Sequence, residues 1–169
     1  MSDPATCGRA FVFGDNIDTD VLAPGHLMKL SPPELAGHCL EAIDVDFAKS
    51  VRVGDFVVAG QNFGLGSSRE QAAISLKLLG VQAVIATSFA RIFYRNALNL
   101  GLPALFCDEA NQIRSGDELD VDPVGGTIHN LTSRQILTCR PIPAHLMAMV
   151  SSGGLIAHIQ ASKTDTRIS

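Results

Sequence analysis

The run Gly-Leu-Gly-Ser-Ser-Arg-Glu, residues 64–70, contains side chains suited to binding an anion. It stands between a predicted buried strand and a predicted helix. Its two glycines let the backbone come close to a ligand, and the first turn of a helix offers unpaired N–H groups. Ser67 and Ser68 add hydroxyls, and Arg69 adds a guanidinium that can hold a carboxylate through two hydrogen bonds. Together these residues predict an anion site.

The same loop also has a purely structural explanation. Ser67 and Glu70 have the spacing of a capping box, in which the serine only caps the helix. A capping box requires neither the preceding Gly-x-Gly nor an arginine inside the motif, so we favour the functional interpretation. Arg69 occupies the place of the third glycine of a dinucleotide fingerprint, and no lysine stands where a Walker A loop needs one. The loop therefore matches neither of these nucleotide-binding motifs.

A second polar segment contains three aspartates within six residues, at positions 15–20. The spacing and the closing glutamate of an EF-hand are missing, and turn chemistry alone explains Asp15 and Asn16. Thr19 and Asp20 directly precede an apolar pair, which turn chemistry does not explain. An acidic residue beside an arginine-bearing loop could orient a hydroxyl or take part in proton handling.

The elements that must position these loops alternate between strand and helix, which predicts a layered α/β fold built on βαβ units. The tail is predicted to add a β-hairpin, one more strand and a closing helix. Strands are predicted at 9–14, 56–60, 81–88, 103–107, 118–122, 128–131 and within 134–143, and helices at 32–49 (with a second short piece at 46–49), 68–79, 89–101 and 143–152.

Composition predicts one domain, residues 1–169, because the chain has 169 residues and no visible linker. Hydrophobic residues make up 46%, enough for a core, so global disorder is excluded. The formal net charge is -4 and no basic stripe occurs, which argues against nucleic acid as a partner. No apolar run is long enough to cross a membrane, and the first residues have no export pattern. We therefore expect a cytoplasmic protein without a membrane partner.

The four cysteines, at positions 7, 39, 107 and 139, form no C-x-x-C pair and have no histidine at zinc spacing. They are expected to be free, buried thiols. No cysteine spacing here suits an iron–sulfur cluster, so we expect this chain to bind no metal.

Three long segments together resemble a known family. GDNIDTDVLAPG (14–25), AGQNFGLGSSREQA (59–72) and VIATSFARIFYRNALNLGLPAL (84–105) are similar, in this order and spacing, to the small subunit of 3-isopropylmalate dehydratase, itself similar to the C-terminal swivel domain of aconitase. The resemblance covers about residues 8–159, the expected ordered core, and implies a swivelling β/β/α fold. The polar end of the chain, 160–169, is expected to be a frayed tail. The resemblance also implies a large-subunit partner that holds a [4Fe–4S] cluster, and a hydro-lyase of the leucine pathway that is inactive without this partner.

The resemblance assigns roles to individual residues. Ser67 matches the catalytic serine, which takes the proton next to a carboxylate. Asp20 with Thr19 matches a Thr-Asp pair near the active site, so we predict both as catalytic residues beside Ser67. Ser68 and Arg69, with the close-approaching backbone of Gly66, match the residues that hold the substrate's carboxylate. A serine hydroxyl is a poor base, so it needs the nearby N–H groups and cation to stabilise its alkoxide.

The substrate is predicted from the segment His26–Lys29, which matches the loop that selects the substrate's variable group. Met28 favours an apolar group such as isopropyl, whereas Lys29 could reach a further carboxylate. We therefore expect 2-isopropylmalate, with 2,3-dimethylmalate, homocitrate or citrate as alternatives, and a non-catalytic swivel module as another. Leu65 and Gln71 replace the family's usual Cys and His, which weakens the link to leucine biosynthesis more than the link to a dehydratase.

Overall fold

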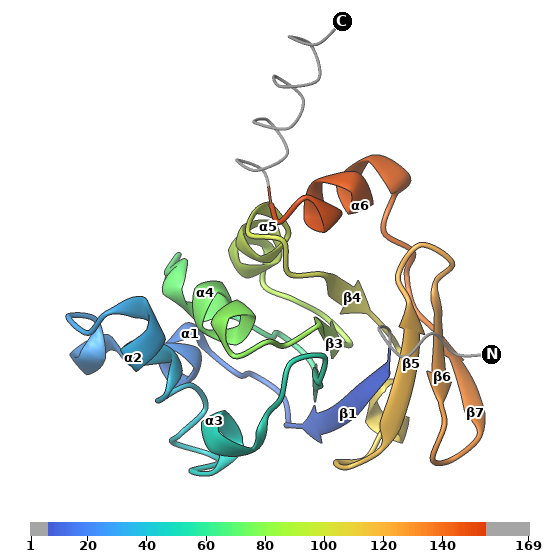
Figure 1. Ribbon diagram of the computed structural model, residues 1–169, viewed down its shortest axis with the longest axis horizontal. Helices are drawn as coiled ribbons and strands as arrows, with labels where there is room; N and C mark the ends of the chain where they lie inside the picture. Colours follow the sequence, from blue (N-terminus) through green and yellow to red (C-terminus); the bar gives the residue numbers. More distant parts are fainter. Residues whose placement is uncertain (1–6, 155–169) are drawn as a thin grey trace, which may run out of the picture.

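The computed structural model describes residues 7–154, which surround a seven-stranded mixed sheet (Figure 1). Its order is β4-β3-β2-β1-β5-β6-β7, in which β1 to β4 pair in parallel and β5 to β7 continue antiparallel from β1. The strands are β1 (Cys7–Val12), β2 (Phe56–Ala59), β3 (Ala83–Ala86), β4 (Ala104–Phe106), β5 (Glu118–Asp122), β6 (Thr127–Asn130) and β7 (Gln135–Thr138). The layered α/β prediction is confirmed, and each predicted strand is present with bounds shifted by a few residues.

Most helical segments lie between the parallel strands in sequence and pack in one core cluster, whereas the last helix, which follows β7, packs in the cluster that contains residues of β5–β7 (Figure 1). The helical segments are α1 (Thr19–Leu22), η2 (Gly25–Leu27), α2 (Pro32–Ala36), α3 (Phe47–Ser50), α4 (Gln71–Leu78), α5 (Arg91–Asn99), η3 (Ala110–Gln112) and α6 (Ala144–Ser151). No helix within residues 7–154 is long and apolar enough to span a bilayer. The predicted frayed tail, 160–169, lies outside the described residues.

The central strands are buried on both faces, which explains their nearly continuous apolar sequence. In β2, Val57 and Ala59 join the core cluster that contains residues of α1 to α5. Phe56 and Val58 point the other way, into the cluster shared with β5–β7 and α6. The parallel strands therefore lie between two packed cores. Their ends are rigid supports for the loops that follow them.

The predicted helix at 32–49 is wrong in extent. Helix α2 ends at Ala36, and the chain then proceeds through turns to α3. Leu40 adopts the left-handed conformation, with φ 61°, and is fully buried. Its N–H donates to Val21 O at 3.0 Å rather than to an oxygen of a continuing helix. Burial of Leu40 beside α1 thus outweighs the local helical preference.

A buried carboxylate, Asp55, fixes the entrance to β2 and is only 5% exposed. It accepts hydrogen bonds from the backbone N–H groups of Arg9, at 3.0 Å, and Arg52, at 2.8 Å. The Arg9 guanidinium also donates to it, at 3.4 Å. One side chain therefore ties the start of β1 to the turn before β2.

We expect Asp55→Ala to lower the free energy of unfolding by about 2–3 kcal/mol, because two backbone N–H groups lose their acceptor. Urea denaturation of the isolated chain measures this change. Asp46→Ala is the control, since Asp46 is exposed and its side chain makes no capping bond. Equal denaturation midpoints for the two variants would contradict the assignment.

Candidate functional site

The loops that follow β1, β2 and β3 stay side by side beyond the ends of the strands. Asp18 forms an isolated parallel bridge with Leu65, and Phe63 forms another with Phe89. The Thr19 N–H donates to Leu65 O at 2.9 Å. These contacts continue the parallel pairing beyond the strand ends, so residues that follow neighbouring strands come together. Open α/β sheets usually bind ligands at this edge, the carboxyl ends of their parallel strands.

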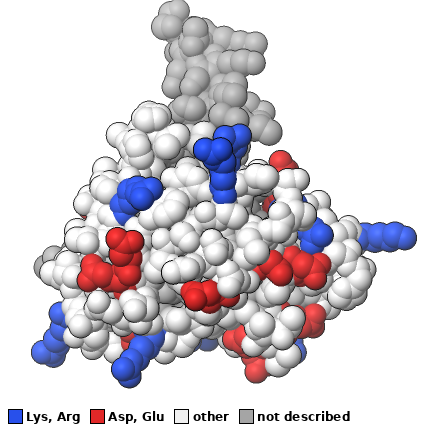
Figure 2. All heavy atoms as spheres, turned by 180° about the vertical axis from the view of Figure 1, so that it is seen from behind, with Lys and Arg blue, Asp and Glu red and all other residues white. Residues whose placement is uncertain are grey.

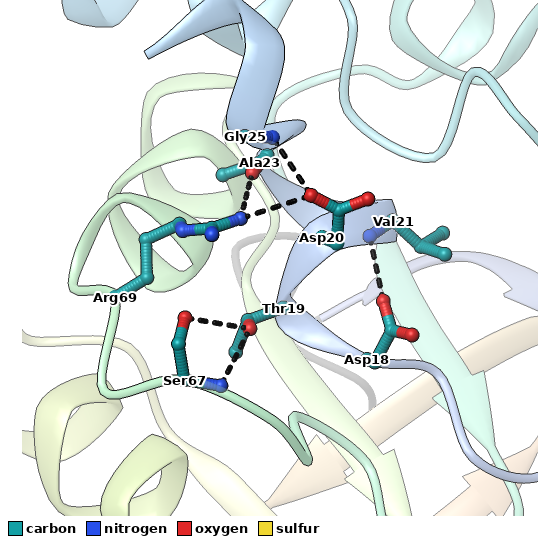
Figure 3. A network of polar contacts seen from close by, with 8 residues as sticks. All are labelled: Asp18, Thr19, Asp20, Val21, Ala23, Gly25, Ser67 and Arg69. Atoms are coloured by element: carbon teal, nitrogen blue, oxygen red, sulfur yellow. Dashed lines mark hydrogen bonds and ion pairs between the residues drawn. The ribbon is translucent and has the colours of Figure 1, made fainter.

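The first pair brought together is Thr19 and Ser67, on loops 48 residues apart (Figure 3). The Ser67 N–H donates to Thr19 Oγ1 at 3.2 Å, and the two hydroxyl oxygens are also 3.2 Å apart. Thr19 is 3% exposed, whereas Ser67 is exposed. Gly66 permits this approach, because its φ is +112° and a Cβ there would stand 3.0 Å from Thr19 Oγ1.

The second pair is Asp20 and Arg69 (Figure 3). Arg69 Nη1 donates to Ala23 O at 2.7 Å and to Asp20 Oδ1 at 3.3 Å. The same Asp20 oxygen accepts the N–H of Gly25 at 2.8 Å. Arg69 is thus held at one nitrogen by the segment that follows α1.

The pKa of Asp20 lies below its ordinary value, first because the Gly25 N–H donates to the carboxylate and then because Arg69 does. A lowered pKa in the folded state means that these contacts stabilise the fold at neutral pH. As the pH falls below the ordinary value of about 3.9 and then through the lowered pKa, the carboxylate becomes protonated and this stabilisation is lost.

We expect an NMR titration to place the Asp20 carboxyl below its ordinary pKa, and Arg69→Gln to raise it only part of the way back. The rise is partial because the Gly25 N–H, the larger cause, remains. A wild-type value at or above the ordinary one would contradict the contacts described here.

Other residues of the acidic segment have structural roles. Asp18 caps α1 by accepting the Val21 N–H at 2.8 Å, and Asp15 accepts the Gln61 N–H at 2.8 Å. Asn16 has φ 58° and lies in the turn. The positive φ of Asn16 fits the predicted turn. The side chains of Asp15 and Asn16, however, bond to residues 61 and 62 in the loop after β2 rather than to their own turn.

The predicted start of the following helix is wrong by three residues. Helix α4 begins at Gln71, and Glu70 precedes it without any side-chain cap. The capping box offered as an alternative is therefore not formed. The reason is tertiary, because the Ser67 N–H bonds to Thr19 rather than to the helix. The groups available to bind an anion are therefore those of the loop and Arg69, not the N–H groups of the helix terminus.

A residue that the sequence did not single out, Asn96, also supports this loop. Its Nδ2 atom lies 3.4 Å from Ser68 O, so α5 contacts the loop from a third direction. The side chain of Ser68 is exposed beside it. Asn96 lies inside the long segment 84–105 quoted above, but neither its residue type nor its spacing indicated this contact.

The residue before the segment predicted to select the substrate, Gly25, lies beside Arg69. A Cβ on Gly25 would lie 3.4 Å from Arg69 Nη2. Met28 is half-buried against the core cluster of α1 to α5, and Lys29 is exposed. Leu65 and Gln71 are both half-buried, and Leu65 contributes its carbonyl to Thr19.

Three of the four cysteines, Cys39, Cys107 and Cys139, are buried, whereas Cys7 is half-buried. Burial raises the pKa of Cys39 far above its usual range, raises that of Cys139 to about 11, and raises that of Cys107. These three thiols therefore stay protonated at neutral pH. Within the described part of the chain, no three side chains of His, Cys, Asp or Glu gather closely enough to hold a metal ion.

The chain is similar to known proteins over most of its length. The profile of the aconitase C-terminal domain matches residues 40–109. The 3-isopropylmalate dehydratase small subunit of Clostridium beijerinckii is 51% identical over 90% of this chain and 96% of its own length. The chain belongs to this small-subunit family. The 2,3-dimethylmalate dehydratase small subunit of Eubacterium barkeri is 49% identical, over 92% of this chain and 97% of that protein.

A solved structure shows the same fold. The crystal structure of 3-isopropylmalate dehydratase from Methanocaldococcus jannaschii matches with a TM-score of 0.90 and 41% identity, over 96% of this chain and 97% of that one. The predicted swivelling β/β/α fold class is therefore confirmed, as is membership of a family of aconitase-type hydro-lyase subunits.

Proposed function

We propose that the chain is the small subunit of a two-subunit hydro-lyase that isomerises 2-isopropylmalate to 3-isopropylmalate through the alkene. The observation that carries this proposal is the exposed Ser67 hydroxyl on the same short loop as the anchored guanidinium of Arg69. The names of relatives such as those of C. beijerinckii and M. jannaschii support the same reaction.

Arg69 is arranged to bind a carboxylate while it stays anchored. Its Nη1 atom makes both contacts to Asp20 and Ala23, whereas Nη2 and Nε have no hydrogen bond to residues 7–154. The free nitrogens can form the two parallel bonds that a carboxylate accepts. Ser68, whose exposed side chain follows Ser67, is proposed to hold the same group.

Ser67 is proposed to take the proton from the carbon next to this carboxylate. A carbon beside a negative carboxylate is hard to deprotonate, so Arg69 lowers the barrier by neutralising that charge. Asp20 acts on the reaction by holding Arg69 and does not reach the substrate itself in this proposal.

The large subunit is proposed to carry the [4Fe–4S] cluster, since no three potential metal ligands gather within residues 7–154 of this chain. That cluster supplies a Lewis acid that polarises the leaving hydroxyl. The small subunit alone is then inactive, because it contributes only the base and the carboxylate site. On the face drawn in Figure 2, acidic and basic side chains are interspersed around a largely uncharged middle, which supports a partner other than nucleic acid.

The side chain at Met28 favours an alkyl malate, because it is apolar and the segment that carries it follows Gly25, which lies beside Arg69. The relative from E. barkeri makes 2,3-dimethylmalate the second candidate substrate. Homocitrate and citrate are further candidates, because the exposed Lys29 could bind their additional carboxylate. The intact contacts of Ser67 and Arg69 argue against a non-catalytic module.

The test is anaerobic co-purification with the large subunit, followed by assays of water loss from 2-isopropylmalate, 2,3-dimethylmalate, homocitrate and citrate. We expect turnover of 2-isopropylmalate by the complex and none by the small subunit alone. Preference for a tricarboxylate would overturn the substrate assignment, and a complex inactive on all four would favour the non-catalytic module.

A further inference from the structure

The hydroxyl of Thr19 has a hydrogen-bonding arrangement that fixes the direction of its proton. A threonine hydroxyl has one hydrogen to donate and two lone pairs to accept with. One lone pair of Thr19 Oγ1 accepts the Ser67 N–H at 3.2 Å. Among residues 7–154, Ser67 Oγ is the other hydrogen-bond partner of this hydroxyl. Because Thr19 is 3% exposed, leaving its hydrogen without an acceptor would be costly.

We infer that Thr19 is a positioning residue whose buried hydroxyl donates its hydrogen to Ser67 Oγ. This inference rests on the proposed function, in which Ser67 is the base. It also revises the sequence-based prediction, which placed Thr19 with Asp20 among the catalytic residues. A side chain this buried holds Ser67 and does not touch the substrate.

The direction of this bond matters for the chemistry. If Thr19 donates, the remaining lone pairs of Ser67 Oγ and any proton on it face the exposed side of the loop. The bond also strengthens when Ser67 is an alkoxide, because a hydrogen bond to a charged oxygen is about twice as strong as a neutral one. Thr19 therefore stabilises the basic form of Ser67 selectively.

Proton transfer leaves this bond in place. The substrate's C–H bond breaks, an O–H bond forms on Ser67 Oγ, and the electron pair stays on the substrate to form the alkene as its hydroxyl departs. Thr19 keeps its own hydrogen throughout and still donates to the new hydroxyl. Its role is thus to hold the oxygen and tune its basicity.

Thr19→Val tests the inference in the complex with the large subunit, because valine keeps the shape and removes the hydroxyl. We expect kcat to fall by about 10- to 100-fold with KM changed by less than about threefold. We also expect the rise of kcat/KM with pH to move upward by about one unit or more. Thr19→Ser restores the donor and should return both quantities close to wild type.

A readout without turnover comes from hydrogen exchange of the Ser67 amide in the small subunit alone. Thr19→Val removes its acceptor, so this amide should exchange faster, and Thr19→Ser should restore its protection. Thr19→Cys, of similar size but a much weaker donor, gives the same comparison if Thr19→Val does not assemble.

The outcomes separate this inference from the proposed function. Wild-type kcat and an unmoved pH profile in Thr19→Val, in a complex where Ser67→Ala is inactive, would overturn the role of Thr19 alone. A reduced kcat with an unmoved pH profile would mean that Thr19 has only a structural role, and it would overturn the proposed effect on the basicity of Ser67. Full activity of Ser67→Ala would instead overturn the proposed function.

Discussion

Replacing Ser67 with alanine is expected to lower kcat of the reconstituted complex by about 1,000-fold, within the range that a positioned general base contributes. Ser67 Oγ is the one reacting group that this loop presents in the proposed mechanism, and its exposed position leaves it free to meet a substrate. KM should change little, because Ser68 and Arg69 still bind the carboxylate. Steady-state kinetics with 2-isopropylmalate measure both values.

The matched control is Ser133→Ala, an exposed serine in the turn between β6 and β7. It removes the same atom outside the site and should leave kcat unchanged. Both variants should bind the large subunit. Ser133→Ala should unfold at the same urea concentration as wild type, whereas Ser67→Ala should unfold at a lower one, because the buried Thr19 hydroxyl loses its acceptor. Turnover by Ser67→Ala within about threefold of wild type would exclude Ser67 as the base.

The sequence predicted the sheet well because its central strands must be apolar on both sides. β2 and β3 are short, wholly buried runs, and only a strand between two packed layers needs such a pattern. The antiparallel β5 alternates instead, with Leu119 and Val121 buried between more exposed neighbours, and the glycine-containing turns on both sides of it predicted the hairpin. Patterns that record burial are therefore recoverable from the chain alone.

The details of the site were harder to predict because they depend on contacts between distant loops. The late start of α4 occurs next to the bond between Ser67 and Thr19, which are 48 residues apart, and local propensity contains no record of that bond. The contact of Asn96 with Ser68 is of the same kind. The residue types of Ser67, Asp20 and Arg69 indicated a common site. Which of their atoms come into contact could be known only from the folded structure.

Replacing Arg69 with lysine is expected to lower kcat/KM by about 100-fold, although the charge is retained. The guanidinium has two functions in this proposal. Nη1 is anchored to Ala23 O and Asp20, while Nη2 and Nε can bind a carboxylate. A lysine has a single ammonium, which cannot keep the anchor and also form two parallel bonds to the substrate. The loss should appear in both KM and kcat, because Arg69 binds the carboxylate and neutralises it during proton removal.

Arg134→Lys is the matched control, because Arg134 is exposed in the turn between β6 and β7, outside the loops that form the site. It should leave kcat/KM unchanged. Asp20→Asn separates the two functions of Arg69, since it weakens the anchor but leaves the whole guanidinium. If carboxylate binding dominates, Asp20→Asn must cost much less than Arg69→Lys. An equal cost would mean that the anchored position of Arg69, more than its pair of free nitrogens, limits the reaction.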